Sequence, residues 1–333
     1  MKRIISLLLI TLTVFGALLS LGSCSFGGST DGGETQKTNV KISVLNGTTG
    51  FGAAKLMEDN ANGASANNYE FKVETDATNI ISALIAGTID MAALPTNAAA
   101  NVHNKTNGQV QVLAINTLGV LYLIEKNDQI SDISDLNGKT VYVPAQNPTF
   151  ITKYILESNG INASIDSTTY STPAALQAAV VAGQVELAVL PQPVVTAAIA
   201  GANKSGNNYS IALDLTEEWD KIPNSEQLVQ GCIVVRKEFA QNNKNAVEWF
   251  LNEYEASINY LNENPKEASE LIVKYGIFAN ASVAEKAIPK CNVVFMKGEE
   301  MKTAMKAFIS AMYEIAPASV GNKLPSDDFY IVN

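Results

Sequence analysis

The chain has few of the residues that most often carry out catalysis or hold metal ions. Among its 333 residues there is one histidine, His103, in a polar HNKTNG segment, and there are three cysteines. No Cys or His residues have the spacing of a metal site, and no nucleophile motif occurs. We therefore expect no metal, no cofactor and no enzyme active site, and we expect His103 to be a solvated loop residue.

Cysteine is too scarce for a disulfide-rich scaffold. Beyond Cys24, only Cys232 and Cys291 occur, each among apolar residues. A disulfide between them would be allowed in an exported chain, but two buried thiols fit the apolar surroundings better. We expect both thiols to be free and buried.

Basic residues are outnumbered, and arginine is almost absent after the N-terminus. Without Lys2 and Arg3, 21 Lys and Arg stand against 33 Asp and Glu, a formal charge of about −12. This excess of negative charge argues against binding nucleic acid or an anionic lipid surface. The one remaining arginine is Arg236, so the chain lacks the arginine fork that, with a carboxylate, holds a zwitterionic amino acid.

Apolar runs of spanning length are restricted to the N-terminus. Lys2 and Arg3 precede an apolar run over residues 4–21, which ends in Leu-Gly-Ser-Cys24. This pattern predicts a lipoprotein signal peptide at residues 1–23, with lipid added to Cys24 after cleavage. An uncleaved membrane anchor is the alternative, since the run is nearly long enough to span a bilayer.

The segment after the signal is poor in residues that can be buried. Residues 24–38 are rich in Gly, Ser and Thr and are predicted to form a flexible tether. About 295 residues follow, which is enough for two domains with a core in each.

The body of the chain contains an internal repeat. Residues 81–97 read ISALIAGTIDMAALPTN, and residues 177–193 read QAAVVAGQVELAVLPQP. Six of the 17 paired positions are identical, and each copy predicts a small-residue helix ended by glycine, a short apolar strand and a proline-led polar loop. Residues 40–61 and 138–160 correspond in the same way, so two lobes of similar build are predicted.

Strand-like and helix-like segments alternate through both lobes. Further strands are predicted at residues 68–75, 110–116, 165–172 and 209–215. This spacing predicts βαβ units with a parallel sheet in each lobe, an α/β fold class. The apolar runs 117–126 and 228–237 are predicted to cross between the lobes as a two-strand hinge.

The crossings set the domain boundaries. Lobe one is predicted at residues 39–118 plus 232–333, and lobe two at residues 119–231. Helices predicted near residues 247–261, 266–275 and 299–314 are expected to cover lobe one and brace the hinge.

Ligands of open α/β sheets bind beyond the carboxyl ends of the strands, so the loops at those ends are the candidate site. The loops are rich in amides, hydroxyls and glycines and contain no cation. They suit an ionised phosphate or sulfonate held by backbone N–H groups, or a neutral ligand stacked on Tyr122, Phe51, Phe150 or Trp219. The predicted ligand-binding residues are Asn46, Gly47, Thr48, Thr49, Gly50, Phe51, Thr96, Asn97, Thr117, Gln146, Asn147, Thr149 and Gln192.

A dinucleotide-binding enzyme is the alternative that this loop set raises. Gly47, Gly50 and Gly52 follow a strand and open a helix, but their spacing differs from GxGxxG. We therefore do not expect nucleotide chemistry.

Longer segments carry a family resemblance. They are GTTGFGAAKLME (47–58), DMAALPTNAAANVHNKTNG (90–108), AINTLGVLYLIEK (114–126), DLNGKTVYVPAQNPTF (135–150), LAVLPQPVVT (187–196), LDLTEEWDK (213–221), AIPKCNVVF (287–295) and KLPSDDFYIV (323–332). Together they resemble the extracytoplasmic solute-binding lipoproteins of ABC importers, in the branch of nitrate, sulfonate, taurine and thiamin-precursor binders. Within that branch they most resemble a clostridial-type group of unassigned ligand.

The resemblance implies a type II periplasmic-binding-protein fold that captures a small-molecule ligand and delivers it to the permease and ATPase subunits of an ABC importer. Such a receptor is expected to be a monomer, held to the outer face of the cell membrane through Cys24. Thr48 stands where such proteins tend to carry proline, and Ala145-Gln146-Asn147 replaces a more glycine-rich turn. A sensory or adhesion lipoprotein on the same fold, or an exported enzyme, are the alternatives.

Overall fold

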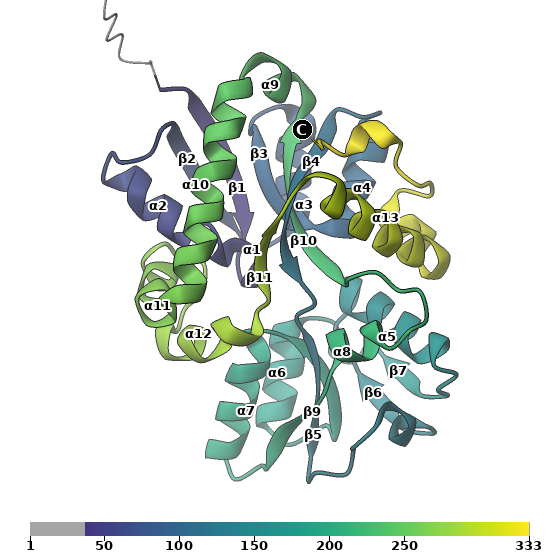
Figure 1. Ribbon diagram of the computed structural model, residues 1–333. Helices are drawn as coiled ribbons and strands as arrows, with labels where there is room; N and C mark the ends of the chain where they lie inside the picture. Colours follow the sequence, from purple (N-terminus) through teal and green to yellow (C-terminus); the bar gives the residue numbers. More distant parts are fainter. Residues whose placement is uncertain (1–36, 333) are drawn as a thin grey trace, which may run out of the picture. The chain divides into compact units, whose positions relative to one another are not determined.

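Two β-sheets organise the part of the chain that the computed structural model describes, residues 37–332. The predicted Cys24 lipidation site, the signal peptide and the tether up to residue 36 lie outside the described residues. Sheet one has the order β11-β4-β10-β3-β1-β2, and sheet two has the order β7-β6-β8-β5-β9. We call sheet one with its covering helices lobe one, and sheet two with its helices lobe two (Figure 1).

Sheet one is built from six strands, four from residues 39–118 and two from residues 229–296. They are β1 (Asn39–Leu45), β2 (Asn68–Glu74), β3 (Met91–Pro95), β4 (Val110–Leu118), β10 (Val229–Arg236) and β11 (Val293–Met296). Sheet two has five strands, namely β5 (Leu121–Lys126), β6 (Thr140–Tyr142), β7 (Ser164–Asp166), β8 (Leu187–Pro191) and β9 (Tyr209–Asp214). The repeated phrase forms β3 and β8, which match residue for residue at an offset of 96.

Helices cover both faces of each sheet. Lobe one has α1 (Thr48–Phe51), α2 (Ala54–Ala61), α3 (Ala77–Ala86), α4 (Thr96–Lys105), α9 (Lys237–Asn242), α10 (Lys244–Glu263), α11 (Pro265–Lys274), α12 (Ala281–Ala287) and α13 (Gly298–Ile315). Lobe two has α5 (Asn147–Ser158), α6 (Pro173–Val181), α7 (Val194–Lys204) and α8 (Leu215–Asp220). The predicted α/β class with two similar lobes is confirmed.

The sheets differ from the parallel sheets expected from the sequence. In sheet one, β10 runs antiparallel to both β3 and β4, and in sheet two β5 runs antiparallel to both β8 and β9. The reason is the crossing: β5 follows β4 after a two-residue link at Gly119 and Val120, so it enters sheet two from the opposite side. β10 returns to sheet one in the same manner after residues 221–228, and it already pairs with β4 at Val229.

Strand β7 is shorter than the predicted segment 165–172. It ends at Asp166, whose Oδ1 accepts the N–H groups of Thr168 and Thr169, both at 2.9 Å. An aspartate that satisfies the next N–H groups offers the backbone an alternative to the sheet ladder, so the strand stops there.

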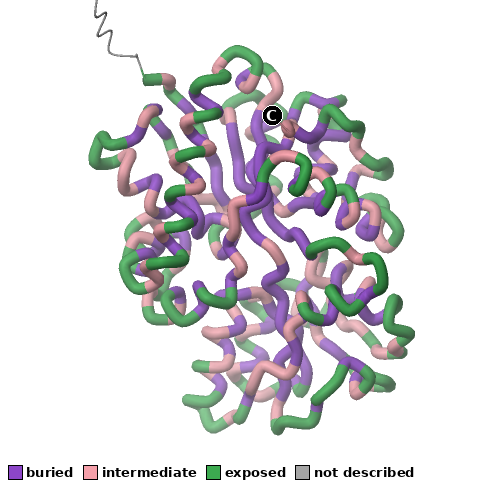
Figure 2. Tube along the Cα trace, in the orientation of Figure 1, coloured by how far each residue is buried: buried purple, intermediate pink, exposed green. Residues whose placement is uncertain are grey.

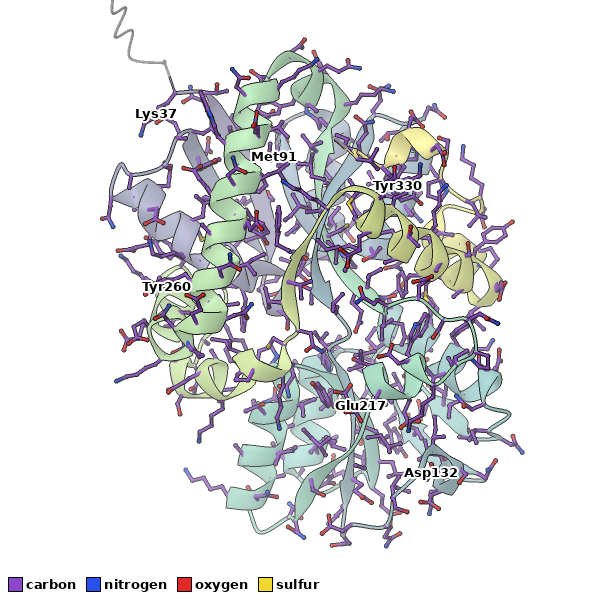
Figure 3. The ribbon with its side chains drawn as sticks, in the orientation of Figure 1. Lys37, Met91, Asp132, Glu217, Tyr260 and Tyr330 are labelled. Carbon is purple, nitrogen blue, oxygen red and sulfur yellow. The ribbon has the colours of Figure 1, made fainter. Side chains whose placement is uncertain are left out.

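The hydrophobic cores are centred on the strands, which are the buried segments in Figure 2. One cluster fills the space between sheet one and α2, α10 and α11, and includes Phe51 and Phe250. A second cluster joins the other face of sheet one, with α4 and α13, to residues of lobe two. The C-terminal segment closes this face with Tyr330 (Figure 3). Lys306 Nζ of α13 lies 5.8 Å from the ring centre of Tyr330.

Two sequence expectations concern single residues in these cores. The prediction that Cys232 and Cys291 are free and buried is confirmed. The prediction that His103 is a solvated loop residue is wrong: it lies in α4, is 2% exposed, and packs 4.7 Å from the ring of Phe329. Its Nδ1 lies 2.7 Å from the Val110 carbonyl oxygen. Helix α4 continues to Lys105, so the polar turn begins after the histidine.

Candidate functional site

Four loops meet where lobe one faces lobe two. In lobe one, β1 pairs with β3, so the loops that follow these strands are neighbours, and β6 pairs with β8 in lobe two with the same result. The two pairs of loops touch, because Thr48 Oγ1 after β1 donates a 2.7 Å hydrogen bond to the carbonyl oxygen of Gln192 after β8. The fold thus places the predicted residue Thr48 of lobe one against the predicted residue Gln192 of lobe two.

Side chains from these loops leave polar atoms buried without a partner. Thr96 is fully buried, Asn97 is 7% exposed and Gln192 is 2% exposed. Thr96 Oγ1, Asn97 Oδ1, Asn147 Oδ1 and Gln192 Nε2 form no hydrogen bond within the described chain. Each such atom costs about 1–3 kcal/mol of free energy if it stays unpaired. Of the nine buried side-chain atoms without a hydrogen bond in residues 37–332, four lie on these loops, two in each lobe.

The orientation of Gln192 follows from its neighbours. Its Oε1 accepts the hydroxyl of Thr196 at 2.8 Å and the backbone N–H of Thr196 at 3.4 Å. A backbone N–H can only donate, so Oε1 is the end that faces Thr196. The unpartnered Nε2 is therefore a hydrogen-bond donor aimed away from α7.

Most helices that begin at these loops lack side-chain caps. No side chain caps the first turn of α4 or α5. In α7 the N-cap residue gives no cap, but the Thr196 N–H of the first turn bonds to Gln192 Oε1. By contrast, α3 and α6, which begin elsewhere, are capped by Asp76 and Thr172. Uncapped N-termini leave backbone N–H groups available to a bound molecule.

The predicted residue Thr117 supports the segment after β1 through hydrogen bonds within lobe one. Its hydroxyl donates to Asn116 Oδ1 at 3.1 Å, while Asn116 Nδ2 donates to the carbonyl oxygen of Thr49 and to the hydroxyl of Tyr254, each at 2.9 Å. A Cβ at Gly231 would approach Asn116 Oδ1 to 2.6 Å, so this crowding needs glycine. Asn116 is thus a positioning residue that the predicted set missed, and only its place at the end of β4 could have revealed it.

Several predicted residues do not face the meeting point of the loops. Phe51 is fully buried in the core, 6.4 Å from Phe278. Asn46 is exposed, and its N–H donates to Glu74 in the neighbouring β2. Thr149 Oγ1 donates to the Pro144 carbonyl oxygen at 2.8 Å within its own loop.

The aromatic residues considered for stacking are mostly used in packing. Trp219 is 2% exposed and lies between Tyr154 at 4.9 Å and Phe308 of α13 at 5.9 Å. Phe150 lies in the first turn of α5, is half-buried, and its N–H donates to the Gln146 carbonyl oxygen at 3.1 Å. The Tyr122 hydroxyl donates at 2.9 Å to the Lys290 carbonyl oxygen of lobe one. Together with the Thr48 bond, this contact ties the lobes on both sides of the loops.

The charges near the loops are negative. Burial raises the pKa of Tyr122 well above its usual value, and the nearby Asp214 carboxylate raises this pKa further. Burial likewise raises the pKa of Cys291 to about 12, so the thiol stays protonated. Arg236 lies at the far end of β10, where it pairs with Asp90 at 3.6 Å and Glu238 at 3.3 Å.

Residues 37–332 contain no group of three or more potential metal-ligating side chains. Across the same residues, each helix is too short or too polar to cross a membrane.

Two α/β lobes joined by short crossings, with polar loops from both lobes meeting at one place, define the class of two-lobe solute-binding proteins. The sequence also matches a family model over residues 62–286, more than half of the chain. That model describes the periplasmic substrate-binding protein of phosphonate ABC transporters, and the chain belongs to this family. It is the periplasmic substrate-binding component of an ABC importer.

Solved structures share the fold. An ABC transporter protein from Parabacteroides distasonis is 24% identical, with a TM-score of 0.75 over 89% of this chain and 99% of that one. The aliphatic sulphonate binding protein SsuA from Escherichia coli is 15% identical, with a TM-score of 0.70 over 88% and 96%. The nitrate-binding protein NrtA from Synechocystis is 14% identical, with a TM-score of 0.60 over 86% and 85%. Direct comparison with curated protein sequences gives no match.

Proposed function

We propose that this receptor binds one small molecule between its lobes, at the loops that contain Thr96, Asn97, Asn147 and Gln192, and delivers it to the permease. The observation that carries the proposal is the set of buried polar atoms without partners, two from each lobe. A molecule that bonds to both sets of atoms has its most favourable free energy of binding when the lobes are together. Its higher affinity for the closed form drives closure.

The other predicted residues have supporting roles in this proposal. Gly47, Thr48, Thr49 and Gly50 form the loop and short helix that contact lobe two, and Thr117 fixes that loop through Asn116. Gln146 and Thr149 shape the start of α5. Catalysis has no part in the proposal, since the loops supply amides and hydroxyls without a nucleophile and base.

The same proposal includes a lipid anchor on Cys24 and a monomeric receptor. The support for the anchor is the sequence Leu-Gly-Ser-Cys24 after an apolar run. Each lobe contributes loops of the same chain to the site, so a single chain suffices for binding.

Binding at the loops is tested with Asn97→Ala and Asn147→Ala. The small-molecule fraction of a rich growth medium is titrated into the protein, and the dilution that gives half the maximal rise in melting temperature measures relative affinity. We expect each variant to weaken binding by about 1–3 kcal/mol, or five- to 150-fold.

Asn60→Ala and Asn203→Ala are the matched controls. The Asn60 amide is hydrogen-bonded to the backbone of Tyr69 within lobe one, and the Asn203 amide is hydrogen-bonded to the backbone of Tyr209 within lobe two. These variants should lower the melting temperature without changing the half-maximal dilution. Unchanged affinity in Asn97→Ala and Asn147→Ala would mean that the ligand binds elsewhere.

A further inference from the structure

A buried glutamine, Gln230, joins the two crossings between the lobes. It is the second residue of β10 and is 8% exposed. Its Oε1 accepts the backbone N–H of Val120 at 2.7 Å. Val120 belongs to the two-residue link between β4 and β5, so this hydrogen bond connects the strand that returns to lobe one with the link that leaves it.

The backbone of β10 is irregular at Gln230. Val229 and Gly231 pair with consecutive residues of β4, so two steps along β10 match one step along β4. Gln230 is therefore the extra residue of a β-bulge, a distortion that takes a side chain out of the regular alternation of the strand and re-aims it. The re-aimed side chain reaches Val120, which lies beyond the end of β4.

Val120 in turn holds Gln192, the ligand-loop residue of lobe two. The Gln192 N–H donates to the Val120 carbonyl oxygen at 2.9 Å, and the Gln192 carbonyl oxygen accepts the Thr48 hydroxyl of lobe one. The Gln192 Oε1 accepts the Thr196 hydroxyl. Three of the four polar groups of Gln192 thus have partners, and Nε2 is the group left for a ligand. The position of this donor depends on Val120.

The neighbour of Gln230 supports the ligand loop of lobe one. Gly231 pairs with Pro95 at the end of β3, and Thr96 and Asn97 follow Pro95 directly. Gln230 therefore lies one residue from the strand pair that carries the lobe-one loop. Through its side chain it is also one hydrogen bond from the link that holds the lobe-two loop.

We propose that Gln230 is a positioning residue for ligand binding, because by fixing Val120 it sets the place of Gln192 Nε2 relative to the ligand loop of lobe one. The proposal rests on the proposed function and adds to it a residue outside the four loops. Without the Gln230 oxygen, the buried Val120 N–H has no partner and the link moves to find one. Gln192 moves with the link, because its own N–H is bonded there.

Gln230→Met tests this role with a side chain of similar length that offers only a weak acceptor. In the same melting-temperature titration with the small-molecule fraction of rich growth medium, we expect about five- to 20-fold weaker binding. Gln230→Asn keeps the amide but is one methylene too short to reach Val120, and it should show the same loss. This second variant carries the comparison if the methionine variant does not fold.

Asn60→Ala is the matched control. The Asn60 Oδ1 also accepts a backbone N–H, that of Tyr69 at 2.8 Å, at the other end of lobe one from the ligand loops. Its loss should lower the melting temperature without changing the half-maximal dilution. A side chain that only satisfied a buried N–H would behave in this way at position 230 as well, so wild-type affinity of both Gln230 variants would overturn the proposal and leave the proposed function intact.

Coupling to Gln192 separates positioning from a general weakening of the protein. In a Gln192→Met protein the donor that Gln230 positions is gone, so adding Gln230→Met should weaken binding by less than about threefold. In an Asn97→Ala protein the full loss should remain. Equal losses in the two backgrounds, or wild-type affinity of Gln192→Met, would overturn the proposal. Wild-type affinity of both Gln192→Met and Asn97→Ala would contradict the proposed function itself.

Discussion

Gln146 and Gly47 occupy equivalent positions in the two lobes and share an unusual backbone. Gln146 lies between β6 and α5, and Gly47 lies between β1 and α1. Gly47 has φ 85° and ψ −159°, and Gln146 has φ 69° and ψ −133°. Glycine adopts this region freely, whereas another residue there costs about 1–3 kcal/mol. Gln146 therefore holds strain at the edge of the proposed ligand site.

Replacing Gln146 with glycine should relieve that strain. Because the side chain is exposed, we expect Gln146→Gly to raise the free energy of unfolding by about 1 kcal/mol in chemical denaturation. Gly47→Ala is the matched control and should lower it, since a Cβ there meets no atom within 4 Å and the cost is backbone strain alone. Equal stability of Gln146→Gly and wild type would argue against strain at this position.

His103 is the one buried imidazole, and its burial predicts a pH dependence. Desolvation lowers its pKa below the usual 6.5, while the Val110 carbonyl oxygen and Asp328 act against this, and Lys323 and Lys237 act with it. The unfolded chain therefore binds the proton more readily than the folded one. The stabilisation is complete above the unfolded pKa of 6.5 and is lost as pH falls through the lowered folded pKa.

The comparison of wild type with His103→Gln across pH 7.5 to 5 isolates this contribution, with pH values chosen around the ordinary histidine pKa of about 6.5. The free energy of unfolding of wild type should fall with decreasing pH, and that of the variant should fall less. The lowered carboxyl pKa values of Asp327 and Asp328 act at lower pH and do not confuse the result. Parallel curves would mean that His103 does not titrate differently on folding.

Among the elements, the link between β4 and β5 sets the approach of the lobes. Gly119 passes against α8, and a Cβ at this position would overlap Thr216 Oγ1 and approach Leu228 Cδ2 to 3.0 Å. Asn292 Nδ2 donates to the Gly119 carbonyl oxygen at 2.6 Å, which adds a contact from the segment before β11. The crossing is thus closely packed from both lobes.

Gly119→Ala should destabilise the protein by overpacking this crossing, by about 1–3 kcal/mol in thermal or chemical unfolding. Trp219, which packs against Phe308 of lobe one, should change its fluorescence as the lobes shift. Adding Thr216→Ala removes the overlapping hydroxyl and should restore part of the lost stability. A Gly119→Ala protein with wild-type stability and fluorescence emission would show that the crossing accommodates the added Cβ without overpacking.

For the whole molecule, the repeat and the loop positions could be predicted because they depend on local pattern. Gly87, Pro95, Gly183 and Pro191 end helices and strands by backbone geometry, and they recur at one offset. Strand direction at the crossings could not be predicted in this way, since it depends on which lobe a strand comes from. The burial of Phe51 and His103 depends on distant partners, Phe278 and Phe329, which sequence spacing does not reveal.

The proposed attachment to the membrane is a property of the whole molecule that would depend on one residue, Cys24. Cys24→Ala should release the protein into the soluble fraction after cell disruption, because no lipid can be added. A Ser23→Ala variant keeps a small residue before the cleavage site and should stay membrane-bound. If Cys24→Ala still sediments with membranes, the apolar N-terminal run acts as an uncleaved anchor.

In the proposed function, one ligand joins the two lobes through the unpartnered atoms of the four loops. A crystal structure of the protein with the ligand recovered from the small-molecule fraction of the growth medium tests this binding mode. We predict electron density within about 2.7–3.2 Å of Thr96 or Asn97 in lobe one and of Asn147 or Gln192 in lobe two. Density bound to one lobe only, or away from these side chains, would mean that the ligand does not join the lobes at these loops.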